Sequence, residues 1–221
     1  MGKLTTHFTK VQQLFLTTLL KENYIRDTFY LTGGTALAAC YLNHRLSEDI
    51  DLFSVQKLDE PRVVEAFSTL IGPIAKTIEY ARIHDRLAYT IEFPKKQKLK
   101  VDVVHYPYKQ IESPSQTHQR LPVDSFADIG VNKLLTISQR TQSKDFVDLF
   151  YILKKYTVWD LRHGVEHKFK MDIEPFYLSS LFYKVEELTT LPRMKKKLTL
   201  EELKHFFLSE AKKLARTMVK P

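Results

Sequence analysis

A single cysteine, Cys40, stands among the 221 residues of the chain. One thiol cannot form a disulfide within the chain, and the usual cysteine-based zinc sites need several thiolates. The sequence therefore excludes an internal disulfide and a cysteine-rich zinc site. We expect a protein of a reducing compartment, the cytoplasm.

Long hydrophobic runs are also missing. No apolar stretch approaches the roughly 18 residues that a transmembrane helix needs, and residues 1–7 lack the charged head and apolar run of a secretory signal. The sequence predicts neither a membrane partner nor a secretory signal.

Acidic residues are fewer than basic ones, 26 against 34, which gives a formal net charge of +8. Such an excess favours an acidic partner, most often nucleic acid, although a generally basic cytoplasmic protein has the same composition.

The hydrophobic pattern predicts an α+β fold. Apolar residues make up 43% of the chain, enough for a core. Helical spacing covers residues 4–23, 35–44 and 60–71, and strand-like runs cover residues 29–32, 49–53, 76–83, 86–93 and 99–106. Four more helices follow at residues 125–139, 143–156, 173–188 and 200–220. We therefore expect a core with a small mixed sheet over residues 1–108, a linker over 109–123 and a helical C-terminal domain over 124–221.

Three acidic residues lie on predicted strands. Asp49 and Asp51 are two residues apart, so their side chains project from the same face of a strand. Asp102 interrupts an otherwise apolar strand, where a carboxylate needs a partner. Three oxygen donors on neighbouring strands suit Mg²⁺ or Mn²⁺. Taken singly, each carboxylate could instead belong to the solvent face of a strand.

A pair of glycines, Gly33 and Gly34, ends one predicted strand and begins a helix. Glycine lets the backbone approach a phosphate closely, and a helix N-terminus offers N–H groups to it. The lysine of a Walker loop and the third glycine of a dinucleotide-binding loop are both missing. The pair alone is typical of a plain turn. Followed by Asp49, Asp51 and Asp102, it predicts a site for a nucleotide and metal ions.

Four segments carry a resemblance to a known family: residues 31–38 (LTGGTALA), 41–53 (YLNHRLSEDIDLF), 128–135 (DIGVNKLL) and 144–150 (KDFVDLF). They resemble the AbiEii/AbiGii toxin family, whose members are nucleotidyltransferases with a catalytic core like that of DNA polymerase beta. The resemblance covers about residues 29–153. Many members of the superfamily carry Gly-Ser where this chain has two glycines, so Thr35 either supplies the missing hydroxyl or leaves it absent.

The resemblance implies roles for individual residues of the first two segments and for Asp102. Gly33, Gly34 and Thr35 would hold the triphosphate of an NTP. Asp49 and Asp51 would ligate two divalent ions, Mg²⁺ or Mn²⁺. Asp102 would share one ion and help to deprotonate the attacking hydroxyl.

Other candidates have an equally good structural interpretation. Ser47 could reach the mouth of the site or serve its loop. Arg45 could bind a phosphate or pair with Asp49 or a neighbouring acid. The resemblance places Lys133 and Asp145 at the nucleotide. By itself Lys133 would be an ordinary surface lysine, and Asp145 would belong to a set of surface ion pairs in which Arg140 and Lys144 pair with Asp148. Asp148 is expected to be structural.

The predicted function is transfer of a nucleoside monophosphate from an NTP to an acceptor hydroxyl, with release of pyrophosphate. The resemblance implies the toxin of a toxin–antitoxin or abortive-infection system, with RNA, specifically tRNA, as the acceptor and an antitoxin protein as partner. Alternatives are transfer to a small molecule or a protein, a nucleotide- or RNA-binding module without turnover, and a metal-dependent nuclease. The nuclease does not explain Gly33 and Gly34.

Overall fold

The structure, a computed structural model, describes residues 7–114 and 116–216. The chain divides into two compact units, which we describe separately. Unit 1 consists of Met1–Tyr41 and Ser47–Ser125, and unit 2 consists of Leu42–Leu46 and Phe126–Pro221. The short segment 42–46 thus belongs to unit 2 although unit 1 flanks it on both sides in the sequence.

Unit 1 contains a mixed sheet, which in the described residues has seven strands in the order β3-β4-β5-β2-β1-β7-β6. The strands are β1 (Tyr30–Thr32), β2 (Ile50–Ser54), β3 (Thr77–Ile83), β4 (Arg86–Phe93), β5 (Gln97–His105), β6 (Gln116–His118) and β7 (Leu121–Val123). β2 pairs with β5 and β1 pairs with β7 in parallel, while the other neighbours are antiparallel. The sequence prediction of a mixed sheet is confirmed.

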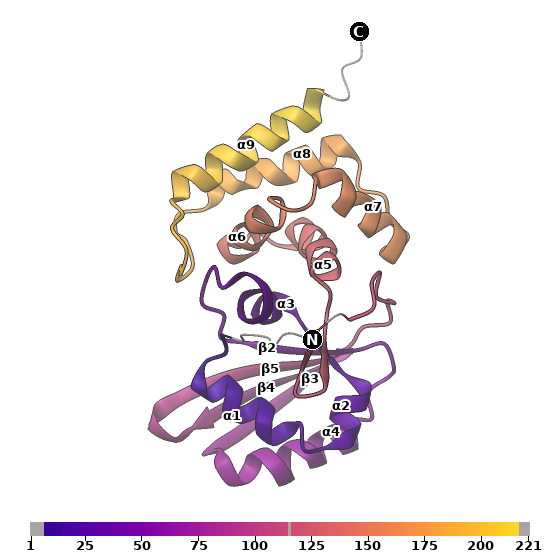
Figure 1. Ribbon diagram of the computed structural model, residues 1–221, viewed down its shortest axis with the longest axis vertical. Coiled ribbons are helices and arrows are strands. Elements are labelled where there is room, and N and C mark those ends of the chain that lie inside the picture. The colour runs from indigo at the N-terminus through magenta and orange to yellow at the C-terminus, as the bar shows by residue number, and fades with distance from the viewer. Residues whose placement is uncertain (1–6, 115, 217–221) are drawn as a thin grey trace. The chain divides into compact units, whose positions relative to one another are not determined.

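Helices lie on both faces of this sheet. Unit 1 has α1 (Lys10–Leu19), α2 (Asn23–Thr28), α3 (Gly33–Ala36) and α4 (Glu60–Ala66); π-helical turns extend α3 over Leu37–Leu42 and α4 over Phe67–Ile71, and a 3₁₀ turn follows over Gly72–Ile74. Figure 1 shows α1 and α4 on one face and α3 on the other. Phe67 stacks on Tyr89 of β4 at 3.9 Å between ring centroids, and Phe15 of α1 packs against Phe67. The face with Tyr89 is therefore the core face.

The first helix is shorter than the prediction over residues 4–23. Thr9 caps α1 at Lys10, because its hydroxyl accepts the Gln12 backbone N–H while the Gln12 side chain accepts the Thr9 N–H. The helix ends at Leu19, and α2, which was not predicted, begins at Asn23. The predicted start at residue 4 lies outside the described residues.

Residues 109–123, expected as a linker, carry the strands β6 and β7. Leu121 and Val123 are fully buried, and β7 extends the sheet by pairing with β1. A strand of three residues is too short to show a periodic pattern. Its pairing partner also lies about ninety residues earlier in the sequence, where Leu31 faces Val123. The aperiodic composition of this stretch therefore hid its place in the sheet.

Unit 2 is helical, as predicted. Its helices are α5 (Phe126–Gln139), α6 (Ser143–Ile152), α7 (Val158–Phe169), α8 (Pro175–Tyr183) and α9 (Leu200–Arg216), with a 3₁₀ turn over Lys184–Glu187. The predicted end of the last helix at residue 220 lies outside the described residues. The rings of Phe146, Phe182 and Phe207 meet edge to face in the core. Segment 42–46 joins this unit through a bridge between Arg45 and Met194.

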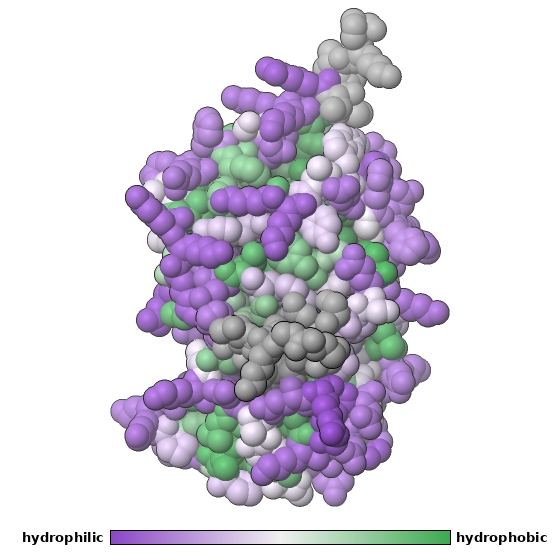
Figure 2. All heavy atoms as spheres, viewed as in Figure 1, coloured by the Kyte–Doolittle hydropathy of each residue, from purple (hydrophilic) through white to green (hydrophobic). Residues whose placement is uncertain are grey.

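The surfaces of both units are mixed in polarity. On the face shown in Figure 2, hydrophilic side chains alternate with separate apolar areas. Among the described residues, no helix combines the length and the hydropathy that crossing a membrane requires. The α+β fold class predicted from the sequence is confirmed, with a mixed sheet in unit 1 and helices in unit 2.

Candidate functional site

The sheet brings two of the predicted carboxylates into direct register. Asp51 of β2 and Asp102 of β5 are Cα partners across the parallel pair, so their side chains project from the same face. Asp49 lies just before β2, two residues from Asp51, and its charge acts on the ionisation of Asp102. The alternate residues Ile50, Leu52, Val101 and Val103 are fully buried on the core face. The alternation of acid and apolar residues in the sequence thus turns the carboxylates away from the core.

Gly33 lies directly against Asp51. Its backbone has φ +74°, a conformation that L side chains rarely adopt, and a Cβ at this position would lie 2.0 Å from Asp51 Oδ2. Glycine is therefore required here for two independent reasons, backbone conformation and space. The register of β1 with β2, in which Thr32 faces Asp51, creates this contact. Gly33 thus lies beside the paired Asp51 and Asp102, and their roles at a nucleotide stay predictions.

The loop before β2 is held by the hydroxyl of Thr35. This side chain is buried, donates a hydrogen bond to the Asp49 carbonyl oxygen and is hydrogen-bonded to Ser47 Oγ at 2.8 Å. Gln12 of α1 donates from Nε2 to the Ser47 carbonyl oxygen at 2.9 Å. These contacts orient the backbone that carries Asp49, and nothing in the sequence pattern marked Gln12 for this role. Contacts of Thr35 and Ser47 with a nucleotide stay predictions.

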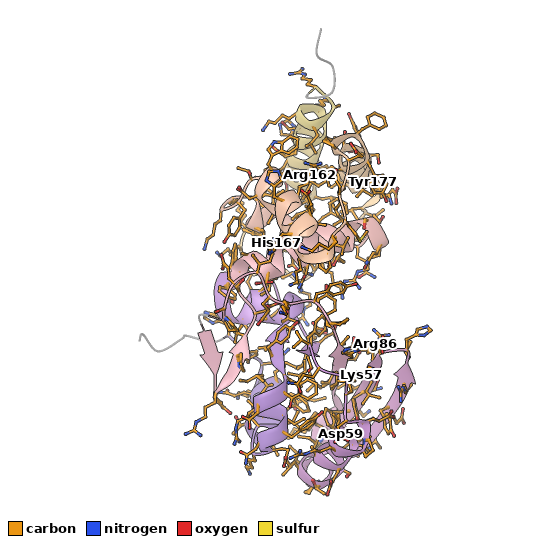
Figure 3. The ribbon with its side chains drawn as sticks, turned by 90° about the vertical axis from the view of Figure 1, so that its right-hand side faces the viewer. Lys57, Asp59, Arg86, Arg162, His167 and Tyr177 are labelled. Atoms are coloured by element: carbon orange, nitrogen blue, oxygen red, sulfur yellow. The ribbon has the colours of Figure 1, made fainter. Side chains whose placement is uncertain are left out.

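Arg86, which the sequence analysis did not single out, contacts Asp102. Its Nη1 donates to Asp102 Oδ2 at 3.2 Å, because the antiparallel register of β4 and β5 places the two residues on one face. Burial raises the pKa of Asp102 above its ordinary value; the Arg86 guanidinium acts against this shift, and the Asp49 carboxylate adds to it. Figure 3 shows Arg86 close to Lys57, and both line a pocket with His105.

The donor set fits a hard divalent cation. Asp49, Asp51 and Asp102 offer carboxylate oxygens from one face, and the unfavourable effect of Asp49 on the ionisation of Asp102 is of the kind that a cation between carboxylates relieves. In residues 7–114 and 116–216, however, no three acidic, histidine or cysteine side chains are already gathered as a metal-binding group. The carboxylates would have to turn toward the ion when it binds.

A buried acid, Asp124, fixes the strand that leads to Gly33. Thr32 Oγ1 donates to Asp124 Oδ2 and Gln110 Nε2 donates to Oδ1, both at 2.7 Å. The Tyr41 hydroxyl donates to the Asp124 carbonyl oxygen at 2.8 Å. Asp124 thereby ties together β1, the end of the π-helical turn and the segment between β5 and β6. Sequence reasoning missed it, since a single acid at an expected domain boundary carries no local signal.

Unit 2 contains a buried cluster of charges centred on Asp148. Its carboxylate is fully buried and accepts hydrogen bonds from Arg45 Nε at 2.6 Å and Nη2 at 2.8 Å. It also lies 2.7 Å from His44 Nε2 and 2.7 Å from Lys133 Nζ. Asp145, also fully buried, pairs with Lys133 at 2.8 Å and with Arg140 at 2.7 Å. The sequence alternative gave Arg45 an acidic partner, Asp49 or a neighbour of it; the structure shows that the acid is Asp148, which is distant in the sequence.

The charges of this cluster stabilise one another. Burial alone would raise the pKa of Asp148, but Lys133 and Arg45 hold it well below its ordinary value, and Lys133 and Arg140 do the same for Asp145. Burial alone would lower the pKa of Lys133, but the two carboxylates raise it. Burial lowers the pKa of His44, so its ring is neutral at neutral pH. Among the described residues its Nδ1 has no hydrogen-bond partner.

The candidate residues therefore divide between the units. Unit 1 carries seven of them: Gly33, Gly34, Thr35, Ser47, Asp49, Asp51 and Asp102. Lys133 and Asp145 belong to unit 2, where Lys133 is only 6% exposed and its ammonium already has two carboxylate partners. Their binding to a nucleotide stays a prediction.

Comparison with known proteins gives one family and a shared fold. The family model described as "Nucleotidyl transferase AbiEii toxin, Type IV TA system" matches residues 14–218. The uncharacterized protein aq_aa25 of Aquifex aeolicus (strain VF5) is 30% identical over 139 residues, 62% of this chain and 63% of the relative. The match thus spans less than two thirds of that relative's length.

Two crystal structures from Helicobacter pylori have a similar fold. A proposed nucleotidyltransferase superposes with a TM-score of 0.59 at 21% identity and covers 96% of this chain and 97% of its own. JHP933 superposes with a TM-score of 0.56 at 23% identity and covers 96% of this chain and 95% of its own. At such identities the likeness concerns the fold alone.

Proposed function

The chain belongs to the AbiEii family of nucleotidyl transferase toxins, and from this premise we propose that it transfers a nucleoside monophosphate from an NTP to the hydroxyl of an RNA acceptor. The membership confirms the family inferred from residues 29–153. The reaction would release pyrophosphate. A tRNA is the acceptor we expect, and an antitoxin encoded with the chain would be its partner in a toxin–antitoxin system.

One observation carries the proposal for the active site. A glycine backbone that could approach a phosphate lies directly against Asp51, whose carboxylate sits beside Asp102 in the sheet. A phosphate binder and two metal ligands in contact are the parts that phosphoryl and nucleotidyl transfer needs, since this chemistry depends on positioning and on neutralising charge. Lone surface carboxylates would not require a glycine at φ +74° beside them.

The glycines and carboxylates of the candidate site in unit 1 have the following proposed tasks. Gly33 and Gly34 would bind phosphate oxygens of the NTP through backbone N–H groups. Asp49 and Asp51 would hold Mg²⁺ or Mn²⁺, and Asp102 would share one ion. When bound, such ions neutralise the charge that develops on the phosphates during transfer.

Asp102 would also accept the proton of the acceptor hydroxyl. Its place in register with Asp51, on the same face of the sheet, supports this task, because a general base has to lie within reach of the reacting hydroxyl. In unit 2, Lys133 and Asp145 would contact the incoming nucleotide, and a nucleotide phosphate would then compete with the carboxylates for the Lys133 ammonium.

The experiment is incubation of the purified chain with total RNA, Mg²⁺ and each α-labelled NTP in turn. We expect label in RNA, no label when the metal is chelated, and a loss of at least a hundredfold in Asp51→Asn, since this change removes a metal-binding charge. Asp27→Asn, at an exposed position on α2, is the matched control. Wild-type transfer by Asp51→Asn would refute the assignment of Asp51.

The same experiment separates the alternative acceptors. Label that appears in a small molecule or a protein, with RNA unlabelled, would replace the RNA acceptor and leave the transfer chemistry in place. If no label moves to any acceptor while the NTP still binds, the chain is a binding module.

A further inference from the structure

The order of the strands indicates from which sides of the sheet the NTP and the acceptor would approach Asp51 and Asp102. Gly33 follows β1, and the strands run on from there as β2, β5, β4 and β3. The NTP would therefore lie at the β1 side of Asp51. Asp102 lies one strand further on, so an acceptor hydroxyl that reaches Asp102 without crossing the NTP comes from the side of β5, β4 and β3. This inference rests on the proposed function.

Exposed lysines occupy the β5 side of that face. Lys98, Lys100 and Asp102 are spaced by two residues along β5, so all three project from the face opposite to the buried Leu99, Val101 and Val103. Successive side chains in such a row are about 7 Å apart, twice the rise of an antiparallel strand. Both lysine side chains are exposed, while Asp102 is half-buried.

The turn between β4 and β5 adds two further lysines. Lys95 and Lys96 are exposed and lie in the short turn that reverses the chain between β4 and β5. Both have positive φ, 64° and 59°, as residues in tight turns can have. The reversal brings them next to Gln97, the first residue of β5. Four lysines, Lys95, Lys96, Lys98 and Lys100, thus extend from the turn toward Asp102; we refer to them as the lysine row.

The lysine row differs from the other cations of these strands. Lys76 pairs with Glu92, Arg82 with Glu60 and Arg86 with Asp102. Within residues 7–114 and 116–216, the ammonium groups of the lysine row have no ion-pair partner. Glu92 is the Cα partner of Lys98, but Lys76 takes its Oε1 at 3.3 Å. Lys100 also acts electrostatically on the Asp102 carboxylate. The four lysines still place an excess of positive charge on this side of the sheet, which favours the binding of a polyanion.

We propose that the lysine row binds the phosphate backbone of the RNA acceptor and leads its reacting hydroxyl to Asp102. Phosphate contacts fix the position of a nucleic acid without reading its sequence. The row would thus set the affinity for RNA and the alignment of its end, while the NTP binds independently at Gly33 and Gly34.

The test measures RNA binding separately from transfer. Fluorescence anisotropy of a labelled tRNA without NTP gives the affinity between about 50 and 200 mM KCl. We expect Lys98→Gln and Lys100→Gln each to weaken binding several-fold and to lower the slope of log K against log salt by about 0.7 to 0.9, and the double variant by about twice as much. The KM for the NTP should stay at the wild-type value while the KM for RNA rises.

Lys21→Gln is the charge-matched control. Lys21 is an exposed lysine just after α1, the helix that packs on the core face of the sheet. The proposal is overturned if Lys21→Gln lowers the salt slope as much as the row variants do, because the attraction would then be diffuse. It is also overturned if the row variants bind tRNA as the wild type does, or if the wild type binds no tRNA.

The outcomes keep this proposal apart from the proposed function. If the wild type binds tRNA through the row but transfers no label, the activity is refuted and the RNA surface stands. If label moves to RNA and the row variants keep both affinity and KM, the activity stands and the row is refuted.

Discussion

At the residue scale, the close approach of Gly33 to Asp51 leaves no room for a side chain. The contact combines a positive φ with a Cβ position 2.0 Å from a carboxylate oxygen, so any substitution must move either the backbone or Asp51. Because Asp51 is the Cα partner of Asp102, such a movement changes the spacing of two proposed metal ligands.

We therefore expect Gly33→Ala to lose transfer activity and stability together. Backbone strain alone costs about 1–3 kcal/mol, and the clash adds to it. Thermal unfolding and labelled transfer would measure both effects. Gly72→Ala is the control, since a Cβ there meets nothing within 4 Å and the backbone is helical, so its stability should be unchanged or slightly higher. Equal behaviour of the two variants would contradict the contact.

Asp148 is the second residue whose replacement should have a large effect. Asp148→Asn keeps the shape but removes the charge that compensates the buried Arg45 and Lys133. Breaking a buried pair in this way costs about 3–5 kcal/mol. Asp172→Asn, at a carboxylate that is 46% exposed and pairs with Arg162 (labelled in Figure 3), should cost at most about 1 kcal/mol. Urea denaturation measures the free energy of unfolding of both variants. Similar losses in the two variants would contradict the role of Asp148 in neutralising the buried cations.

At the scale of elements, β7 depends on Asp124 for its place. The Asp124 carboxylate accepts from Thr32 and Gln110, and its backbone N–H donates to the Leu31 carbonyl oxygen at 2.8 Å. Asp124→Ala would leave the buried Thr32 hydroxyl without an acceptor, at about 1–3 kcal/mol, and would also remove the acceptor of the half-buried Gln110 amide. We expect faster proteolysis of residues 109–123 and reduced transfer, with Asp27→Ala as an exposed control. Wild-type resistance to protease would refute the role of Asp124 in holding β7.

Elements with a local pattern were predictable, and those that depend on distant partners were not. β3, β4 and β5 alternate or follow tight turns, so each was found within two residues of its bounds. β7 is short and exists because β1 is beside it. The sequence analysis missed the helix α7 (Val158–Phe169), which contains Gly164 and has few apolar residues at helical spacing. Its residues Leu161 and Val165 are buried through packing against other parts of the fold.

The candidate site divides along the same line. The proximity of Gly33, Asp51 and Asp102 could be predicted, because a nucleotide and metal site would need those residue types together at the ends and faces of strands. Arg86 could not, since its contact with Asp102 follows from the register of two strands. The pairing of Arg45 with Asp148 joins residues 103 apart in the sequence, and the sequence alone left several acids open as partners.

At the scale of the whole molecule, acid should weaken the fold. The pKa values of Asp145 and Asp148 lie below their ordinary value, so their stabilisation is complete above the unfolded pKa of about 3.9 and is lost as pH falls below it. His44 acts in the same direction below about pH 6.5, because its lowered pKa lets the unfolded chain bind the proton first. Urea unfolding free energies should fall from neutral pH to about pH 4 and further below it. A smaller fall below pH 4 in Asp148→Asn would identify the source, and an equal fall would exclude Asp148.

The assignment of segment 42–46 to unit 2 has a consequence for how the gene can recombine. A recombination event that moved residues 126–221 as one piece would deliver the helices without His44 and Arg45, and Asp148 would arrive with its buried charge only partly neutralised. The two units therefore cannot be exchanged between genes as independent modules. Residues 42–46 and the helices that carry Asp148 are therefore expected to be inherited together.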